Sequence, residues 1–358
     1  MKVLTRYLNR LFLVRFAVVL FGIVGFAAVI DLIDVGAELV KMEGGGLSAG
    51  LRYFGLRLPI MLSELMPIAA LIAGLLTVAD LLRHRELVVI WSSGIRPLAI
   101  LRMLLPVGLV LVGAKFAIDD FALPRATMEL RIWGIGEYRR RPGEGQEGEF
   151  YWVRSGDDIV QLSAPAAVVG KVEDITIYRR DPQGILTERL QAASATPIEH
   201  GWRLLDVTRS VVGAHTIERL PSFDWPGVID LARIKLLARP PRELALSQLW
   251  DIARRGGYGL RAPEPYRTWL HERIASAFVP MLLMMLGFAL VRRFSRTASI
   301  APVFMTAVGI GFTLIIMSGV ASALGEVGVL APALAAWGPP LLLGAIVFLL
   351  GTRGDLTG

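Results

Sequence analysis

Residues 59–81, PIMLSELMPIAALIAGLLTVADL, decide the fold of this chain. Only Glu64 and Asp80 are ionisable within the stretch, and the other side chains are apolar or small. A helix needs about 20 mainly apolar residues to cross the hydrocarbon core of a bilayer. The stretch is too long and too apolar for an amphipathic helix of a soluble protein, so it predicts a membrane-spanning helix.

The same criterion identifies five further spans. They are predicted at residues 16–33, 98–118, 275–291, 300–324 and 334–351. The chain is 54% hydrophobic, whereas soluble domains average about 45–50% apolar residues. We therefore predict an α-helical membrane protein with six transmembrane helices.

Positive charge gathers on one side of these spans. The basic residues on that side are Lys2, Arg6, Arg10, Arg15, Arg83, Arg85, Arg96, Arg292, Arg293, Arg296 and Arg353. On the other side, Glu38, Lys41 and Glu43 nearly cancel, and Glu326 is the one charge between the last two spans. Because cytoplasmic loops are enriched in Lys and Arg, both termini are predicted to be cytoplasmic.

The segment between the third and fourth spans is predicted to be an extracytoplasmic domain, at about residues 119–265, inserted between transmembrane parts 1–118 and 266–358. Strand patterns occur at residues 150–153, 159–162, 174–180, 185–190, 192–198 and 202–212. Turn sequences such as DPQG at 181–184 separate them. This spacing predicts an antiparallel sandwich or roll, and residues 246–255 then follow a helical pattern.

Motifs of catalysis are absent from the sequence. It contains no Walker A, GxSxG, HExxH or Rossmann motif and no cysteine, and its four histidines do not have metal-ligand spacing. Asp157 and Asp158 lie in a predicted turn, where Asp is expected for conformational reasons. We therefore predict that the chain is not an enzyme and that it binds neither a metal ion nor a cofactor of its own.

Residues 83–97, RHRELVVIWSSGIRP, connect the second and third spans. We predict a short amphipathic helix at about residues 82–96, with Gly94 as its C-terminal cap. In one interpretation it joins two spans at the interface, and Arg83 and Glu86 form a solvated pair. In the other it offers an apolar face and one carboxylate to a cytoplasmic partner. The residues alone favour neither.

Several motifs resemble the LptF/LptG (YjgP/YjgQ) family of lipopolysaccharide transport permeases. In chain order they are PIAAL at 67–71, ELVVIWSSGIR at 86–96, ALPR at 122–125, YWVRSG at 151–156, DITIY at 174–178, GVLAP at 328–332 and AAWGP at 335–339. Each motif is weak alone, but their order and the six-span layout make the resemblance specific. The loop at 86–96 and the ending at 328–339 resemble the G-type subunit more than its F-type paralogue.

The resemblance implies an inner-membrane permease of an ABC-type exporter with a periplasmic β-jellyroll-like domain. The partners would be an LptF-type permease, a dimeric LptB-type ATPase that carries ATP and Mg²⁺, and an LptC-type single-helix subunit. Lipopolysaccharide would be the substrate, with no nucleic acid involved. The residues expected to contact the ATPase are Glu86, Leu87, Val89, Ile90 and Gly94.

Lipopolysaccharide carries phosphates, which favour Arg and Lys near the outer interface. The candidates are Lys41, Arg52, Arg57, Lys115, Arg125, Arg131, Arg267 and Arg273, of which Arg273 matches a basic position of the family. Such residues also commonly extend to water and lipid headgroups without binding a ligand. Glu64 is a further candidate, or a structural partner of Arg57. Asp31 stands where studied members of the family have a lysine. This difference argues against the charge pattern expected for phosphate contact, unless nearby arginines or divalent cations compensate.

Two other functions are compatible with the sequence. One is an ABC permease that moves lipoproteins or peptides. The other is a membrane-anchored periplasmic sensor or binding module without an ATPase.

Overall fold

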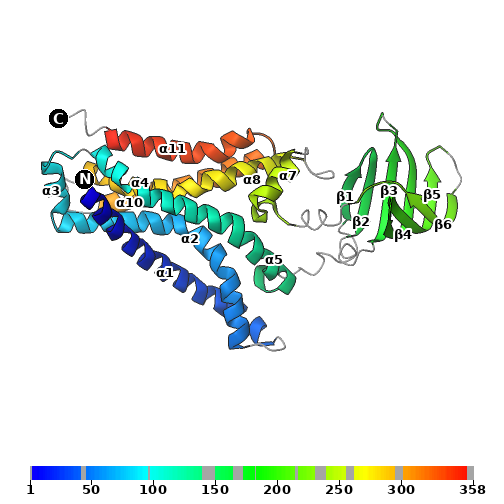
Figure 1. Ribbon diagram of the computed structural model, residues 1–358, viewed down its shortest axis with the longest axis horizontal. Helices are drawn as coiled ribbons and strands as arrows, with labels where there is room; N and C mark the ends of the chain where they lie inside the picture. Colours follow the sequence, from blue (N-terminus) through cyan, green and yellow to red (C-terminus); the bar gives the residue numbers. More distant parts are fainter. Residues whose placement is uncertain are drawn as a thin grey trace. The chain divides into compact units, whose positions relative to one another are not determined.

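The computed structural model describes residues 2–41, 46–95, 97–138, 150–163, 172–181, 183–213, 217–229, 239–254, 262–294 and 301–352. The chain forms two compact units (Figure 1). The first contains residues 1–138, 245–249 and 264–358, and the second contains residues 139–244 and 250–263.

Six helical segments of the described residues are long and apolar enough to cross a membrane, which confirms the six predicted spans. They are α1 (Lys2–Lys41), α2 (Leu47–Arg83), the continuous run of α4 (Pro97–Ala117), η1 (Ile118–Ala122) and α5 (Leu123–Trp133), the run of α8 (Glu264–Ala275), η5 (Ser276–Phe278) and α9 (Val279–Phe294), α10 (Ala301–Glu326), and α11 (Pro332–Thr352). The start of α1, the short helix α3 (Glu86–Ser92) and the end of α11 lie at the same end of this unit (Figure 1).

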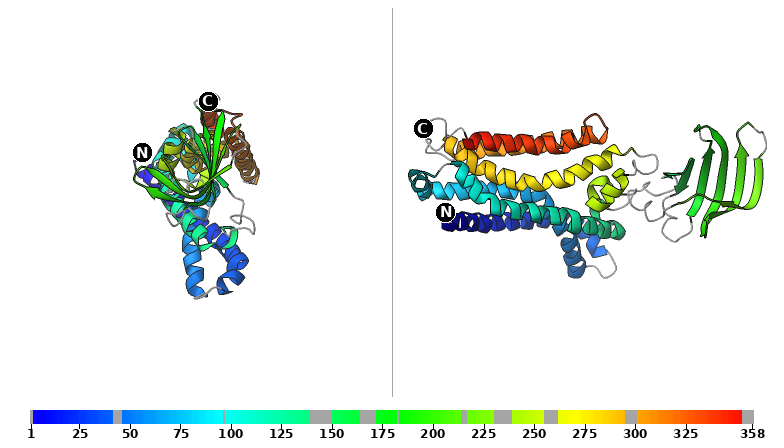
Figure 2. Two further views of the ribbon diagram at one scale, coloured as in Figure 1. Left: turned by 90° about the vertical axis from the view of Figure 1, so that its right-hand side faces the viewer. Right: turned by 45° about the horizontal axis from the view of Figure 1, so that its top comes forward.

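Four spans are markedly longer than the sequence predicted, and in the fourth of the six the added part is α8, which carries charged residues. Hydropathy detects only the apolar part of a helix, and the ends of α1 and α2 and all of α5 carry charged residues. α2 contains Pro59 and Pro67 and bends along its length, so that its first part runs beside the end of α1 (Figure 2). Proline removes a helical hydrogen bond and is a common cause of such a bend.

Glycines allow α2 and α9 to pack closely in the core of the first unit. A Cβ atom on Gly74 would lie 3.0 Å from the carbonyl oxygen of Met284, and one on Gly287 would lie 3.2 Å from the amide nitrogen of Leu75. Small residues at such crossings let helix backbones approach each other, which is the usual packing mode within membranes.

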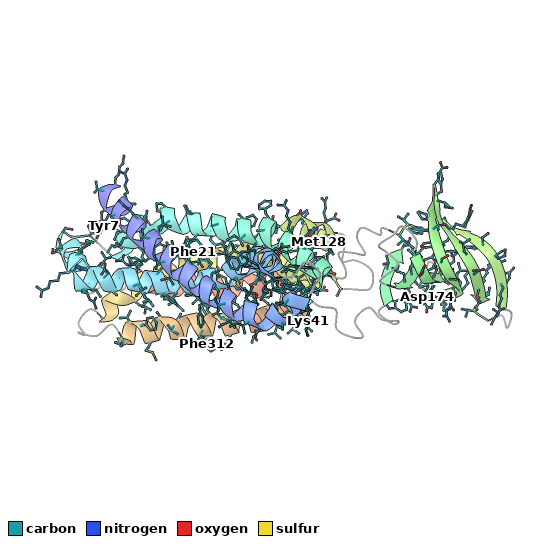
Figure 3. All side chains as sticks on the ribbon, turned by 90° about the horizontal axis from the view of Figure 1, so that it is seen from below. Tyr7, Phe21, Lys41, Met128, Asp174 and Phe312 are labelled. Carbon is teal, nitrogen blue, oxygen red and sulfur yellow. The ribbon has the colours of Figure 1, made fainter. Side chains whose placement is uncertain are left out.

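The outer faces of α1 and α10 are apolar and exposed. Phe21 on α1 and Phe312 on α10 are 67% and 64% exposed, and both point away from the helix core (Figure 3). α1 and α10 are also the two least buried of the six spans. Their faces therefore contact surroundings outside this chain.

The second unit contains one six-stranded antiparallel sheet, in the order β1-β2-β3-β4-β5-β6. Its strands are β1 (Phe150–Ser155), β2 (Asp158–Ser163), β3 (Val172–Arg180), β4 (Leu186–Ile198), β5 (Gly201–Val211) and β6 (Ile217–Trp225). The inserted antiparallel β domain is thus confirmed. The described strands follow one another as a meander, without a crossover between non-adjacent strands.

One face of the sheet forms an apolar core. Val160, Ile177 and Leu190 are opposite one another on β2, β3 and β4 and are fully buried. We name this the inner face and the opposite one the outer face. The hairpin between β3 and β4 is fixed by Asp181, whose Oδ1 accepts hydrogen bonds from the backbone of Gln183 and Ile185. An Asp at this position stabilises a tight turn in the way its sequence predicted.

Four details differ from the prediction. β4 is continuous where two stretches were expected, β6 was not predicted, and η1 is an unpredicted π-helical turn. α3 has seven residues rather than the fifteen of 82–96, because Arg85 has a φ of 58° and interrupts the helix before Glu86. The predicted helix at 246–255 is present as α7 (Leu246–Arg254).

Candidate functional site

The short helix α3 is fixed between a left-handed Arg85 and Gly94, whose φ is 82°. Of the residues expected to contact an ATPase, Leu87 and Ile90 are buried in the core of the transmembrane unit. Val89 is 66% exposed, and Gly94 is exposed as well. The helix is thus anchored by two side chains and presents others outward.

Glu86 is held by the first span. The hydroxyl of Tyr7 on α1 donates a hydrogen bond of 2.8 Å to Oε2 of Glu86. The pair of Arg83 and Glu86 considered from the sequence is not among the ion pairs of the described residues. Glu86 therefore has its contact across the chain, with α1, rather than along its own loop.

A second contact joins the same two parts of the chain. Arg15 on α1 forms an ion pair with Asp80, near the end of α2. His84 Nδ1 lies 3.0 Å from the carbonyl oxygen of Asp80 and 3.4 Å from its Oδ1. Together with the contact of Tyr7, these interactions tie the first turns of α1 to the segment that leads into α3.

At the opposite end of the unit, Arg57 forms a two-pronged contact with Asp31. Its Nε and Nη2 donate hydrogen bonds of 2.9 and 2.6 Å to the two carboxylate oxygens. Both side chains are largely buried, at 13% and 18% exposure. Arg57 is thus the arginine that compensates Asp31, and the alternative pairing of Arg57 with Glu64 is not formed. Glu64 is exposed.

Arg52 and Arg131 lie near Arg57, around a small apolar cluster of α1, α2 and α5. The Arg52 guanidinium is 4.7 Å from the centre of the Trp133 ring and 3.8 Å from Glu129. Arg131 lies 5.6 Å from the ring centre of Tyr138. The cluster itself contains Val35, Leu39, Tyr53, Ile60, Leu130 and Ile135. Three of the predicted cations therefore occur together around a buried apolar cluster.

The remaining candidates are placed differently. Lys41 at the end of α1 is exposed, as are Arg125 and Arg267 (Figure 3 labels Lys41). Arg273 is buried at 6% exposure, and its Nη1 donates a hydrogen bond of 2.6 Å to the carbonyl oxygen of Asp119. The assignment of each of these residues to substrate stays a prediction.

The sequence analysis missed a buried polar network around Asp119. Ser63 Oγ donates 2.6 Å to Asp119 Oδ1, Lys115 forms an ion pair with the same carboxylate, and Lys115 Nζ donates 2.9 Å to Ser63 Oγ. All three side chains are buried. Lys115 and Asp119 are four residues apart in an apolar helix, so this spacing was the signal that could have revealed the pair.

Asp119 and Asp120 occupy the π-helical turn η1. Such a turn interrupts the regular hydrogen bonding of the helix, and here the backbone carbonyl of Asp119 accepts from Arg273. Oδ1 of Asp120 accepts a hydrogen bond of 2.5 Å from the amide of Leu246, the first residue of α7. It satisfies one of the amide groups that a helix N-terminus leaves without an internal partner.

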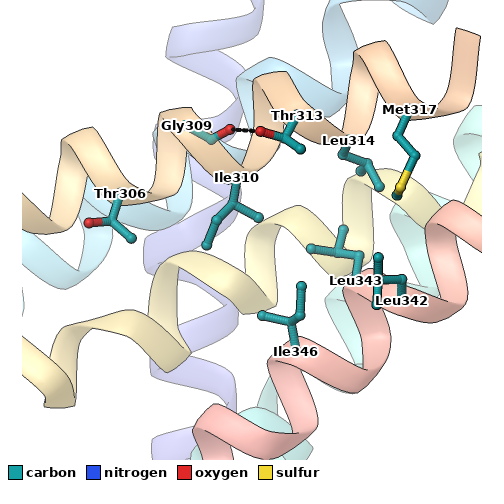
Figure 4. Close-up of a pocket in the computed structure, with 9 residues that line it drawn as sticks. All are labelled: Thr306, Gly309, Ile310, Thr313, Leu314, Met317, Leu342, Leu343 and Ile346. Atoms are coloured by element: carbon teal, nitrogen blue, oxygen red, sulfur yellow. Dashed lines mark hydrogen bonds between the residues drawn. The ribbon is translucent and has the colours of Figure 1, made fainter. Parts of the chain in front are cut away.

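An apolar cavity of about 350 Å³ lies between α10 and α11 (Figure 4). It is lined by Thr306, Gly309, Ile310, Thr313, Leu314, Met317, Leu342, Leu343 and Ile346. The two threonine hydroxyls donate to carbonyl oxygens of their own helix, at Pro302 and Gly309. The cavity therefore offers a hydrocarbon surface within two spans.

The family comparison agrees with this architecture. A family model described as "Lipopolysaccharide export system permease LptF/LptG" matches residues 6–353. No curated protein matches the chain. Because the family match includes the spans, the α3 loop and the β domain, the chain belongs to the LptF/LptG family of lipopolysaccharide export system permeases.

Proposed function

We propose that the chain is the G-type permease subunit of an ABC exporter that extracts lipopolysaccharide from the inner membrane. A separate cytoplasmic ATPase dimer supplies the energy, and a periplasmic bridge receives the lipid. The family match supports the transport role, and the motifs at 86–96 and 328–339 favour the G-type.

The observation that carries the proposal is the placement of α3. It lies at the end of the transmembrane unit where α1 begins and α11 ends. With both termini in the cytoplasm, as the distribution of basic residues indicates, α3 faces the ATPase. Buried Leu87 and Ile90 hold it in place, so a force applied at Glu86 or Val89 reaches the spans.

The opposite end of the unit has the chemistry of a lipopolysaccharide headgroup site. Arg52, Arg57 and Arg131 surround a small apolar cluster there. Guanidinium groups form charge-assisted hydrogen bonds with phosphate. Arg52 is the most available of the three, because its side chain is 60% exposed.

The partner subunits follow from the same proposal. The exposed apolar faces of α1 and α10 suit an F-type permease and a single-helix C-type subunit, with lipid covering the remainder. The β domain is periplasmic in this arrangement. ATP and Mg²⁺ belong to the ATPase.

The test uses the chain assembled with its partner permease and ATPase in lipid nanodiscs. Glu86→Ala is expected to weaken ATPase association or to lower lipopolysaccharide release per ATP about tenfold, since a lost hydrogen bond to a charged group costs about 1.5–3 kcal/mol. Glu199→Ala is the matched control, because Glu199 is exposed in the turn between β4 and β5. Normal association and normal release in Glu86→Ala would refute the coupling role.

A further inference from the structure

The outer face of the sheet carries a row of polar side chains across all six strands. The pairing register places Trp152, Gln161, Thr176, Gln191, Thr208 and Arg219 directly opposite one another, from β1 to β6. Directly opposite residues of antiparallel strands lie on the same face. With neighbouring strands about 4.8 Å apart, the row extends roughly 24 Å.

An aromatic platform stands at one end of this outer row. The rings of Trp152 and Tyr178 stack with their centres 5.6 Å apart and their planes 25° apart. The guanidinium of Arg189 lies 5.8 Å from the centre of the Tyr178 ring. Trp152, Gln191, Arg189 and Arg219 are exposed, Tyr178, Gln161 and Thr208 are half-buried, and Thr176 in the middle of the row is buried. The two ends of the row and Gln191 are therefore the accessible parts among the described residues.

Two hydrogen bonds join the outer row to Tyr178 and Arg189 of the adjacent row. Gln161 Oε1 accepts from the Tyr178 hydroxyl at 3.1 Å, and Gln191 Oε1 accepts from Nη2 of Arg189 at 3.2 Å. The acceptor side of each amide is thus engaged within the sheet, and the amide nitrogens remain as donors. Two guanidinium groups add further donors and positive charge.

Charge distinguishes this surface from the other face of the sheet. No Asp or Glu occupies a position of the outer row or of the adjacent row that contains Tyr178 and Arg189. On the other side of the row, Asp174 and Asp206 are exposed two residues before Thr176 and Thr208. On the inner face, by contrast, Arg179 and Arg209 both pair with Glu188. The arginines of the outer rows therefore favour an anionic ligand, whereas those of the inner face are already neutralised.

We infer that the outer row is a binding surface for an anionic oligosaccharide. Sugar rings stack on exposed Trp and Tyr rings, and their hydroxyl, phosphate or carboxylate oxygens accept from amide and guanidinium donors. Trp152, Gln191 and Arg219 are the exposed members of the row, on β1, β4 and β6, so these are the residues that the sugars of the chain would contact. The inference rests on the proposed function, because it assigns the sugar part of the exported lipid to this surface.

The test measures binding to the full chain in lipid nanodiscs by calorimetry. The probe is the phosphorylated oligosaccharide obtained by removing all fatty acids from lipopolysaccharide, so that acyl-chain sites cannot contribute. A neutral dextran oligosaccharide of similar length is the control for charge. We expect the anionic probe to bind and the neutral one to bind at least about tenfold more weakly, as the loss of charge-assisted hydrogen bonds requires.

Variants locate the surface. Trp152→Ala and the double variant Arg189→Gln/Arg219→Gln are each expected to weaken binding about tenfold, whereas Trp152→Phe keeps a ring and most of the affinity. Arg203→Gln is the matched control, because Arg203 lies outside both rows and is paired with Asp224. Unchanged binding in the first two variants, or no binding by the unaltered chain, would overturn the inference.

A photo-crosslinking residue at position 161 separates a sugar from a protein ligand. Capture of a partner protein alone would also overturn the inference. Glu86→Ala keeps the outer row intact, so it should bind the probe normally while transport falls. Failure of the sugar surface and failure of the proposed transport role are therefore distinguishable.

Discussion

The hydroxyl of Tyr7 and the carboxylate of Glu86 are joined by a hydrogen bond of 2.8 Å between residues 79 positions apart. The bond connects the first turns of the first span to the first residue of α3. The ion pair of Arg15 with Asp80 connects α1 to the end of α2, a few residues before α3 in the sequence. If α3 moves, α1 must therefore either resist the movement or move with it.

Replacing Tyr7 with Phe removes this hydrogen bond and keeps the ring. We expect lipopolysaccharide release per ATP to fall about fivefold, which corresponds to roughly 1 kcal/mol for a partly exposed hydrogen bond to a carboxylate. ATPase association should persist, because Glu86 remains. Tyr266→Phe is the control, because the Tyr266 hydroxyl has no hydrogen-bond partner among the described residues. Equal release per ATP in both variants would show that the link to α1 is not used.

The contact between Asp31 and Arg57 should be an energetic unit. Asp31→Ala and Arg57→Ala each leave a largely buried charge without its partner, so both are expected to lower the stability of the unit. The double variant should be more stable than the sum of the two losses predicts, with a coupling energy of about 1–3 kcal/mol. Denaturant unfolding in detergent micelles measures the cycle, and strict additivity would contradict it.

The pair of Lys115 and Asp119 allows a sharper version of this experiment. Lys115→Met or Asp119→Leu alone is expected to cost about 3–5 kcal/mol, because each leaves an uncompensated charge in an apolar interior. Lys115→Met/Asp119→Leu replaces both charges by apolar groups and should recover most of the lost stability. The yield of monodisperse protein and its thermal midpoint provide the measurement. A double variant as unstable as the single ones would show that the network is needed for more than charge balance.

Glu188 makes the β unit sensitive to acid. Burial opposes ionisation of its carboxyl group, but hydrogen bonds from Arg209 and Arg179 outweigh burial and lower the pKa of Glu188. A lowered pKa stabilises the fold above the unfolded-state value of about 4.3, and this stabilisation disappears as the pH falls through the folded-state pKa. Amide hydrogen exchange of β3, β4 and β5 should therefore accelerate on acidification below about pH 4, after correction for the intrinsic rate.

Glu188→Gln is the matched variant for this pH dependence. At pH 7 it should exchange faster than the unaltered chain by an amount that corresponds to about 1 kcal/mol, because two arginines lose a charged acceptor. At acidic pH the two proteins should converge. A constant difference at all pH values would show that the charge of Glu188 does not stabilise the sheet.

The bilayer itself explains why the spans could be predicted. A run of about 20 apolar residues has few structural alternatives in lipid, so residues 59–81 and their five counterparts are readable from composition. Most strands could be predicted for a similar reason. One face of the sheet is buried, so apolar and polar residues alternate along these strands. β6 lacks this signal, because IERLPSFDW does not alternate, contains Pro221 and pairs only with β5 among the described strands. Proline is tolerated at such an edge.

Long-range partners explain what could not be predicted in the candidate site. Hydropathy gives the depth of Asp31 and Arg57 but not the rotation of their helices, so the choice between Glu64 and Asp31 required coordinates. The same holds for Tyr7 and Glu86. The seven-residue length of α3 depends on the left-handed backbone of Arg85, a conformation that non-glycine residues adopt rarely and that no pattern there indicated.

The π-helical turn η1 connects the third span to two other helices, α2 and α7. Asp119 accepts a hydrogen bond from Ser63 on α2, and Asp120, the next residue, accepts one from the backbone amide of Leu246, the first residue of α7. If this span rotates about its long axis, either one of these hydrogen bonds breaks or the start of α7 moves with the span. A rotation that starts at the end of the span next to α3 would therefore act on α7, which follows the β unit in the chain.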